Sequence, residues 1–186
     1  CALATITSIG KTFFEAVTFS RSWMYRKFNE SSTRSRSPSH YTRSGVNLVY
    51  LLDTNIISEL RRVKPNGAVV SWLERVDDQD LFISVVTIAE IQAGIEITRE
   101  QDAEKAEQIE QWLDLVANTY NVISMDAEIF RTWAKLMHRK SNTLYEDAMI
   151  AATAQVNNLI VVTRNVDDFR IFDSKIINPF DVKEST

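Results

Sequence analysis

Short and almost wholly apolar runs alternate with amphipathic stretches through most of this chain. The runs LVYLL, residues 48–52, and LIVVT, residues 159–163, lack the apolar and polar alternation of a half-exposed strand. Strands of this kind are buried on both faces, as they are in a parallel sheet that helices cover on each side. The alternation of strands and helices therefore predicts an α/β fold, a three-layer α/β/α sandwich around a central parallel sheet.

The remaining elements are expected along the same part of the chain, without internal repeats. Asn66, Thr87 and Asp126 are expected to cap the helices that begin near them. A short strand at residues 175–177 is expected at an edge of the sheet. The other predicted strands are 81–84 and 122–123, and the predicted helices are 56–60, 68–76, 86–97, 102–117, 126–140 and 145–156.

Charge divides the chain into two unlike parts. Residues 1–46 contain seven Lys and Arg against two Asp and Glu, whereas the remainder contains 14 against 23, so a net charge of +5 is joined to one of −9. Residues 31–44, SSTRSRSPSHYTRS, include no aliphatic side chain and cannot bury enough apolar surface to fold. We expect residues 1–46 to be a basic, disordered or non-native extension, with Val46 or Val49 as candidate native starts, and residues 47–186 to form one domain.

Composition excludes several kinds of functional site. Four glycines in the whole chain cannot supply a G-x-G-x-x-G motif or a P-loop, and the single cysteine, Cys1, excludes a multi-cysteine zinc site. Two histidines, His40 and His138, are too few for most histidine-built metal sites or catalytic triads. No apolar run approaches the roughly 18 residues that span a bilayer, so no membrane partner is expected. The carboxylates, 25 Asp and Glu, remain as the plentiful chemical groups.

Four carboxylates follow the predicted strands at the end where sites form in open α/β sheets. Asp53 comes directly after the first strand, and Glu90 lies one turn into the helix that follows the second. Asp147 lies in the first turn of its helix, and Asp168 follows the run LIVVT. Taken alone, Asp53 is explained as a helix cap, Glu90 and Asp147 as partners of a helix dipole, and Asp168 as a loop residue. Together, at one edge of the sheet, the four indicate a shared site.

The chemistry of such a site follows from its donors. Clustered carboxylates repel one another unless a cation neutralises them. Oxygen ligands without Cys or His favour Mg²⁺ or Mn²⁺ over zinc, and such ions engage substrate phosphates. The residues by themselves therefore predict an acidic Mg²⁺ or Mn²⁺ site that acts on phosphate groups.

Four motifs that contain these acids resemble the PIN domain, and in particular the VapC/FitB-type toxins of prokaryotic type II toxin–antitoxin pairs. The resemblance covers about residues 48–181. It implies a PIN-like fold and an endoribonuclease toxin, dependent on Mg²⁺ or Mn²⁺, that cleaves RNA such as tRNA through a metal-activated water. The motifs are YLLDTN at 50–55, SVVTIAE at 84–90, DAMIAATA at 147–154 and VTRNVDDF at 162–169.

The resemblance also implies roles for single residues. Asp53, Glu90, Asp147 and Asp168 would be the catalytic, metal-binding acids, with Asp53 and Asp147 as the closest ligands. In some relatives the position of Asn165 is itself acidic, whereas here the fourth ligand rests on Asp168. The residues that would orient these carboxylates are Thr54, Asn55, Thr163 and Asn165.

Partners follow from the same resemblance. It implies a homodimer in the prokaryotic cytoplasm, silenced by an antitoxin protein whose C-terminal segment enters the acidic groove. The net charge of −9 is a difficulty for RNA binding, which normally uses a basic surface. Bound metal and cations at the rim would offset this charge. The candidate rim cations are Arg61, Arg62, Lys64, Arg139, Lys140 and Arg164.

Two other functions remain open from the sequence. A receiver-like signalling domain also binds Mg²⁺ with acids at strand ends, but it needs paired acids after the first strand and a late lysine, where this chain has Asp53 alone and Thr163-Arg164. A catalytically inactive or regulatory PIN-like module that binds nucleic acid would not need the full set of four acids. A phosphatase of the haloacid dehalogenase type needs D-x-D, whereas residues 53–55 read Asp-Thr-Asn.

Overall fold

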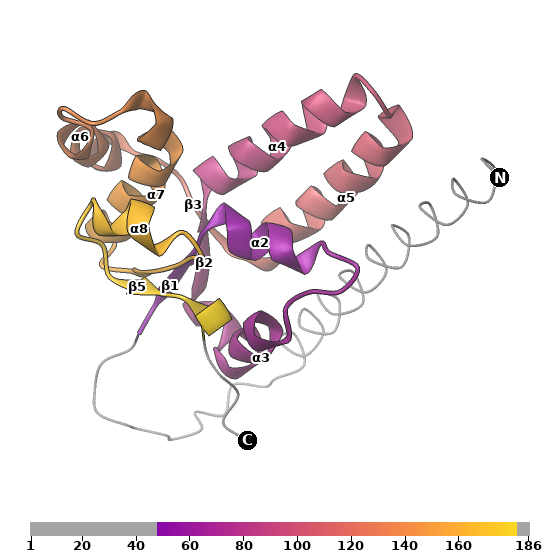
Figure 1. Cartoon of the computed structure of the whole chain (residues 1–186), viewed down its shortest axis with the longest axis horizontal. Coiled ribbons are helices and arrows are strands. Elements are labelled where there is room, and N and C mark those ends of the chain that lie inside the picture. Colours follow the sequence, from indigo (N-terminus) through magenta and orange to yellow (C-terminus); the bar gives the residue numbers. More distant parts are fainter. Residues whose placement is uncertain (1–47, 182–186) are drawn as a thin grey trace.

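The computed structural model describes residues 48–181, and the predicted basic extension, residues 1–46, lies outside them. Within the described residues, five parallel strands form one sheet in the order β3-β2-β1-β4-β5 (Figure 1). The order places β1 at the centre and puts β5 at one edge, as predicted. The strands are β1 (Tyr50–Leu52), β2 (Leu81–Ser84), β3 (Asn121–Ile123), β4 (Ile160–Val162) and β5 (Ile176–Ile177).

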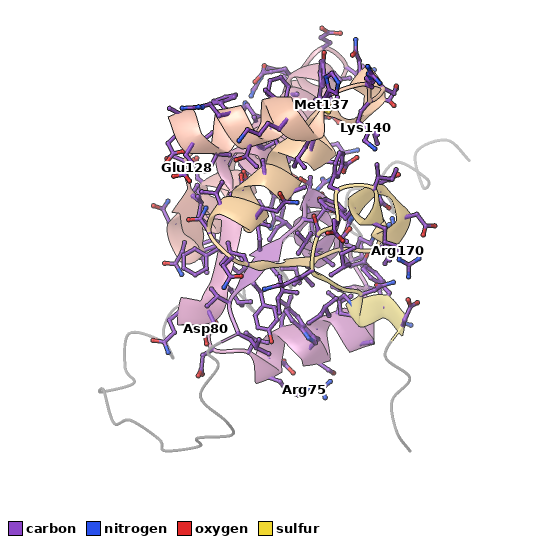
Figure 2. All side chains as sticks on the ribbon, turned by 90° about the vertical axis from the view of Figure 1, so that its left-hand side faces the viewer. Arg75, Asp80, Glu128, Met137, Lys140 and Arg170 are labelled. Carbon is purple, nitrogen blue, oxygen red and sulfur yellow. The ribbon has the colours of Figure 1, made fainter. Side chains whose placement is uncertain are left out.

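Helices cover both faces of this sheet, so the predicted three-layer α/β/α architecture is confirmed (Figure 1). Figure 2 views one helical layer from outside, with Glu128 and Met137 near the two ends of α6. None of the described helices is long and apolar enough to cross a membrane. One layer holds α2 (Thr54–Leu60), α3 (Gly67–Arg75), α4 (Val85–Arg99) and α5 (Ala103–Thr119), and the other holds α6 (Ala127–Leu136), α7 (Tyr145–Val156) and α8 (Val166–Arg170).

The strands contribute to two hydrophobic clusters, one on each face of the sheet. Leu51 and Val161 are paired in register, and both point into the cluster beneath α6, α7 and α8. Their neighbours Leu52 and Val162 point to the opposite face, into the cluster beneath α2, α3 and α5. Successive side chains of a strand alternate between faces, and both faces are buried here. The apolar runs of the sequence therefore show no alternation.

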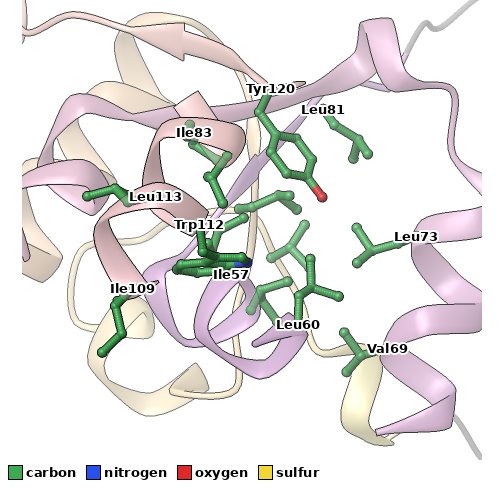
Figure 3. Close-up of a cluster of buried hydrophobic side chains, with 14 of the residues drawn as sticks. Ile57, Leu60, Val69, Leu73, Leu81, Ile83, Ile109, Trp112, Leu113 and Tyr120 are labelled. Carbon is green, nitrogen blue, oxygen red and sulfur yellow. The ribbon is translucent and has the colours of Figure 1, made fainter. Parts of the chain in front are cut away.

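The larger cluster forms around Trp112 of α5, which is almost fully buried (Figure 3). Ile57 and Leu60 of α2 pack into the same cluster as Trp112. The Arg61 guanidinium carbon lies 5.9 Å from the centre of the Trp112 ring, within cation–π range. The larger cluster therefore holds the helix that directly follows Asp53.

Two predicted helix boundaries were wrong. Thr87 does not cap α4, because the helix begins at Val85 and the Ser84 hydroxyl accepts a hydrogen bond from the Val86 amide at 3.2 Å. The helix predicted to reach residue 140 ends at Leu136. Arg139 has a φ of 60°, a left-handed conformation that cannot continue a right-handed helix. The short helix α8 and three single-turn 3₁₀ helices were not predicted.

Tyr120 places a polar atom inside the larger cluster. Its ring lies near Leu73 and Leu81 (Figure 3), and within residues 48–181 its buried hydroxyl has no hydrogen-bond partner. Burial, with a further contribution from the charge of Asp78, raises the pKa of this hydroxyl. A buried donor without a partner destabilises the folded state.

We expect Tyr120→Phe to raise the free energy of unfolding by about 1 kcal/mol, because it removes the unpartnered hydroxyl and keeps the ring. Urea denaturation followed by circular dichroism measures the change. Tyr145→Phe is the control, since Tyr145 is 39% exposed and should change little. A loss of stability in Tyr120→Phe would contradict the prediction.

Candidate active site

The site lies where the strand order reverses. The chain runs from β1 outward to β2 and β3, and then crosses to β4 on the other side of β1. A crevice between the carboxyl ends of such strands is the usual place for a site in an open α/β sheet. Asp53 follows β1, and its amide donates a hydrogen bond to the Val162 carbonyl at 3.0 Å. This contact extends the β1–β4 pairing and brings Asp53 beside Thr163.

Asp53 is a buried carboxylate, 4% exposed, with three hydrogen-bond donors. The Thr54 amide donates to Oδ1 at 2.7 Å, so that Asp53 also caps α2. The Thr163 hydroxyl donates to Oδ2 at 2.6 Å, and the Asn55 side-chain amide donates to the same oxygen. Donors to a carboxylate compensate for part of the cost of its burial. The three donors approach from different directions along the chain and therefore also fix the orientation of the carboxylate.

Asn55 and Thr163 also bind one another and the loop after β4. The Asn55 amide nitrogen lies 3.0 Å from the Thr163 hydroxyl, and the Asn55 side-chain oxygen accepts a hydrogen bond from the Arg164 amide at 3.2 Å. The Thr163 hydroxyl accepts another from the Asn165 amide at 2.9 Å. Asn165 therefore joins this network through its backbone, whereas Asn55 and Thr163 join it through their side chains.

Glu90 is held by the first residue of α2. The Thr54 hydroxyl lies 2.5 Å from Glu90 Oε2, and it also lies 3.2 Å from the hydroxyl of Thr87, which is buried one turn earlier on α4. Thr87 thus packs beside Thr54 instead of capping its own helix. The contact between Thr54 and Glu90 joins α2 to α4 across the mouth of the crevice.

These groups surround one cavity of about 330 Å³. It brings together three of the four predicted acids: Asp53 at the N-terminal cap of α2, Glu90 on α4 and Asp147 on α7. Asp168, on α8, does not line it, although its negative charge acts on Asp147. The lining residues are Asp53, Thr54, Asn55, Ser58, Glu59, Arg62, Glu90, Asp147, Arg164 and Asn165.

The acids of this cavity hold their protons more tightly than usual. Burial raises the pKa of Asp53 to about 7; the charges of Asp147 and Glu90 add to this, and the hydrogen bonds from Thr163 and Thr54 oppose it. Burial also raises the pKa of Glu90 and of Asp147, and Asp168 adds to the effect on Asp147. A bound cation would relieve both causes, since it replaces lost solvation and neutralises the repulsion.

Two lining residues, Ser58 and Glu59, were not identified from the sequence. The signal was the spacing of Asn55, Ser58, Glu59 and Arg62 at i, i+3, i+4 and i+7, which puts polar side chains on one face of a helix. Its other face is apolar and buried. Of the six candidate rim cations, Arg62 and Arg164 line the cavity, whereas Arg61 lies over Trp112.

The donors fit Mg²⁺ or Mn²⁺ in kind, because the lining acids offer only carboxylate oxygens. Within residues 48–181, no group of three or more acidic, histidine or cysteine side chains is arranged to hold a metal ion. Mg²⁺ does not need such a cage, since it keeps several waters and binds through one or two carboxylates. Two acids facing this cavity satisfy that requirement.

Comparison with known proteins agrees with this geometry. The family model for the PIN domain matches residues 50–175. The chain belongs to the PIN-domain family. Plasmid stability protein StbB of Pseudomonas syringae pv. tomato is 34% identical over 138 residues, covering 70% of this chain and 98% of that protein. Toxin FitB of Neisseria gonorrhoeae is 32% identical over 137 residues, covering 70% and 97%.

Solved structures of toxin complexes have the same fold. The crystal structure of FitAcB from Neisseria gonorrhoeae matches with a TM-score of 0.61 at 30% identity, covering 72% of this chain and all of that one. A toxin–antitoxin complex from Klebsiella pneumoniae matches with a TM-score of 0.54 at 28% identity, covering 72% and 99%. The predicted resemblance to VapC and FitB toxins within the PIN-domain family is thus confirmed.

We expect Thr163→Val to lower the free energy of unfolding by about 2 kcal/mol, because it removes a hydrogen bond to a buried carboxylate and leaves the Asn165 amide without its acceptor. Thr153→Val is the matched control. Thr153 is equally buried, but its hydroxyl donates only to the Met149 carbonyl of its own helix. Urea denaturation in EDTA compares the two, and equal losses would contradict the role of Thr163 in holding Asp53.

We also expect the metal-free protein to lose stability as the pH rises. The pKa of Asp53 is about 7 when folded, against an ordinary value of 3.8, so the folded state binds more protons between these values. The free energy of unfolding therefore falls from pH 4 to pH 7 and levels off above. Urea denaturation in EDTA at pH 5 and pH 8 should show a larger fall in the wild type than in Asp53→Asn.

The control for this pH series is Asp114→Asn, which changes an exposed carboxylate on α5. Its pH dependence should match that of the wild type. If Asp53→Asn also matches the wild type, the raised pKa of Asp53 is refuted.

Proposed function

We propose that this chain is the toxin of a type II toxin–antitoxin pair and acts as a metal-dependent endoribonuclease. The observation that carries the proposal is the convergence of Asp53, Glu90 and Asp147 on one cavity where the strand order reverses. A VapC ribonuclease of Sinorhizobium fredii supports it, since that protein is 32% identical over 139 residues, which cover 70% of this chain and 97% of that one. RNA, tRNA included, is the proposed substrate.

In this proposal Asp53 and Asp147 hold Mg²⁺ or Mn²⁺, and Glu90 and Asp168 complete the acidic site. When bound, the ion supplies an activated water and neutralises charge on the phosphate. Thr163 and the Thr54 amide hold the Asp53 carboxylate in a fixed orientation. The chain's own contribution is therefore to bring the acids together and to hold the Asp53 carboxylate in place.

Glu90 is the group placed to move a proton. Its carboxylate lines the cavity, and the Thr54 hydroxyl fixes Oε2. Its raised pKa makes it a better base than an ordinary glutamate. We therefore assign to Glu90 the acceptance of a proton from the attacking water. Asn55 ties the loop after β4 to α2, and the Asn165 amide holds the Thr163 hydroxyl within that loop.

Two protein partners belong to the same proposal, an antitoxin and a second copy of this chain. The first is supported by the relatives, whose structures include FitAB bound to a DNA fragment, at 30% identity and a TM-score of 0.60. The second is supported by α6, where Phe130 is 44% exposed and its ring lies 6.1 Å from that of Trp133. The proposed place of action is the prokaryotic cytoplasm, where RNA substrates are found.

We expect the wild type, freed of any antitoxin, to cleave single-stranded RNA or tRNA in Mg²⁺ or Mn²⁺. Asp53→Ala and Asp147→Asn should each lower the rate by about 100-fold or more, because each removes a proposed ligand. EDTA should abolish cleavage. Gel analysis of labelled RNA measures all of these, with Asp114→Asn as an exposed control that keeps the wild-type rate.

Three outcomes would contradict parts of this proposal. Equal activity in all variants would identify a contaminating nuclease, and undiminished activity in EDTA would refute the metal mechanism. RNA binding without cleavage under any of these conditions would favour the catalytically inactive module instead.

A further inference from the structure

Two arginines bring positive charge to an otherwise acidic cavity. Among the lining residues in the described part of the chain, only Arg62 and Arg164 are cationic. They reach the cavity from separate elements, Arg62 from the turn after α2 and Arg164 from the loop after β4. Each is held by a different contact, and neither contact involves the acids Asp53, Glu90 or Asp147.

Arg62 is fixed by a buried acid. Its Nε lies 3.1 Å from Glu59 Oε2, and the Arg62 side chain is 58% exposed whereas that of Glu59 is only 4% exposed. The other Glu59 oxygen accepts a hydrogen bond from the Asn66 amide at 3.0 Å, at the cap of α3. Glu59 therefore has a fixed position, and it holds one edge of a guanidinium that remains open to solvent.

Arg164 is fixed by an aromatic ring and by the backbone. Its guanidinium carbon lies 5.3 Å from the centre of the Phe180 ring, and Phe180 packs against the larger hydrophobic cluster. Its amide donates to Asn55, the residue that also holds Asp53. The position of Arg164 is therefore tied to that of the central acid.

Fixed arginines at the edge of a cavity suit one kind of ligand. A guanidinium binds phosphate oxygens through paired N–H groups, and it binds more strongly when its side chain is already ordered. The Glu59 charge is balanced by Arg62, so Arg62 does not serve to neutralise the central acids. Arg164 has a ring as its partner. Both guanidinium groups thus have a partner within the chain before any substrate arrives.

We propose that Arg62 and Arg164 bind backbone phosphates of the RNA on either side of the acidic centre, and that Glu59 is a positioning residue for Arg62. This inference rests on the proposed function. It assigns the residues through which a domain with a net negative charge would bind RNA. The acids act at the reacting phosphate, whereas the two arginines bind its neighbours. Binding and cleavage are thereby assigned to different side chains of one cavity.

The test measures binding apart from cleavage. A fluorescein-labelled, 20-nucleotide single-stranded RNA is titrated with protein in EDTA, and anisotropy is followed from 50 to 300 mM KCl. Arg62→Gln and Arg164→Gln should each weaken binding about tenfold, the loss of one charge-assisted contact. Each should also reduce the slope of log affinity against log salt by about 0.7, the value for one phosphate contact on a single strand.

Two matched arginines serve as controls. Arg99→Gln changes an arginine that is ion-paired like Arg62, to Glu96 and Glu110, but lies on the α4–α5 pair away from the cavity. Arg75→Gln changes an exposed arginine on α3. Both remove one positive charge, as the cavity variants do. Because neither arginine lines the cavity, both should leave the affinity within about twofold of the wild type and leave the salt slope unchanged.

Two further variants separate geometry from charge. Arg62→Lys keeps the charge but loses the planar fork, so it should retain the salt slope while weakening binding. Glu59→Gln should also weaken binding although it removes a negative charge, and it should have no such effect when Arg62 is already Gln. An increase in affinity in Glu59→Gln would overturn the positioning role.

The outcomes distinguish this inference from the function on which it rests. If the wild type cleaves RNA in Mg²⁺ and the two cavity-arginine variants bind RNA as it does, the phosphate assignment is overturned and the ribonuclease stands. If folded wild-type protein neither binds nor cleaves RNA, the ribonuclease itself fails, and this inference with it. Circular dichroism of every variant establishes that it is folded.

Discussion

The site depends on one interaction, the contact of the buried Asp53 carboxylate with Thr163 across the β1–β4 pair. A carboxylate at the end of a buried strand is costly unless donors surround it. Here the donors come from α2 and from the loop after β4. They can meet because β1 and β4 are parallel neighbours, so that the segments that follow them leave the sheet at the same edge. The pairing of β1 with β4 thus determines which side chains meet at the site.

Asp53, Glu90 and Asp147 are held together against their own repulsion. Burial is the larger cause of the raised pKa at Asp53 and at Glu90, and the neighbouring charges add to it. Burying the charged acids is unfavourable, and the favourable free energy of burying the two hydrophobic clusters offsets this cost. Functional sites are commonly built in this way, at a local cost in stability that a well-packed fold tolerates.

Sequence reasoning reached most of this fold and part of the site. Runs such as residues 48–52 correctly predicted strands buried on two faces, because an unbroken apolar run is by itself enough to indicate such a strand. Capping by Thr87 was wrong because α4 begins two residues earlier, after Ser84, and the Thr87 hydroxyl instead meets Thr54 of a distant segment. The spacing of polar residues along α2 marks Glu59 as facing the cavity, but its contact with the Asn66 amide, beyond the end of that helix, does not follow from the spacing. Local patterns could not predict contacts of this kind.

Asn55 uses both ends of its side-chain amide at the cavity. One end of its amide faces the acid Asp53, and the other end faces the backbone of Arg164. A side chain that only accepts hydrogen bonds would keep the second contact and repel the acid, whereas one that only donates would do the reverse. Sequence change at this position is therefore constrained from two directions, because a replacement must donate to the carboxylate and accept from the backbone at the same time.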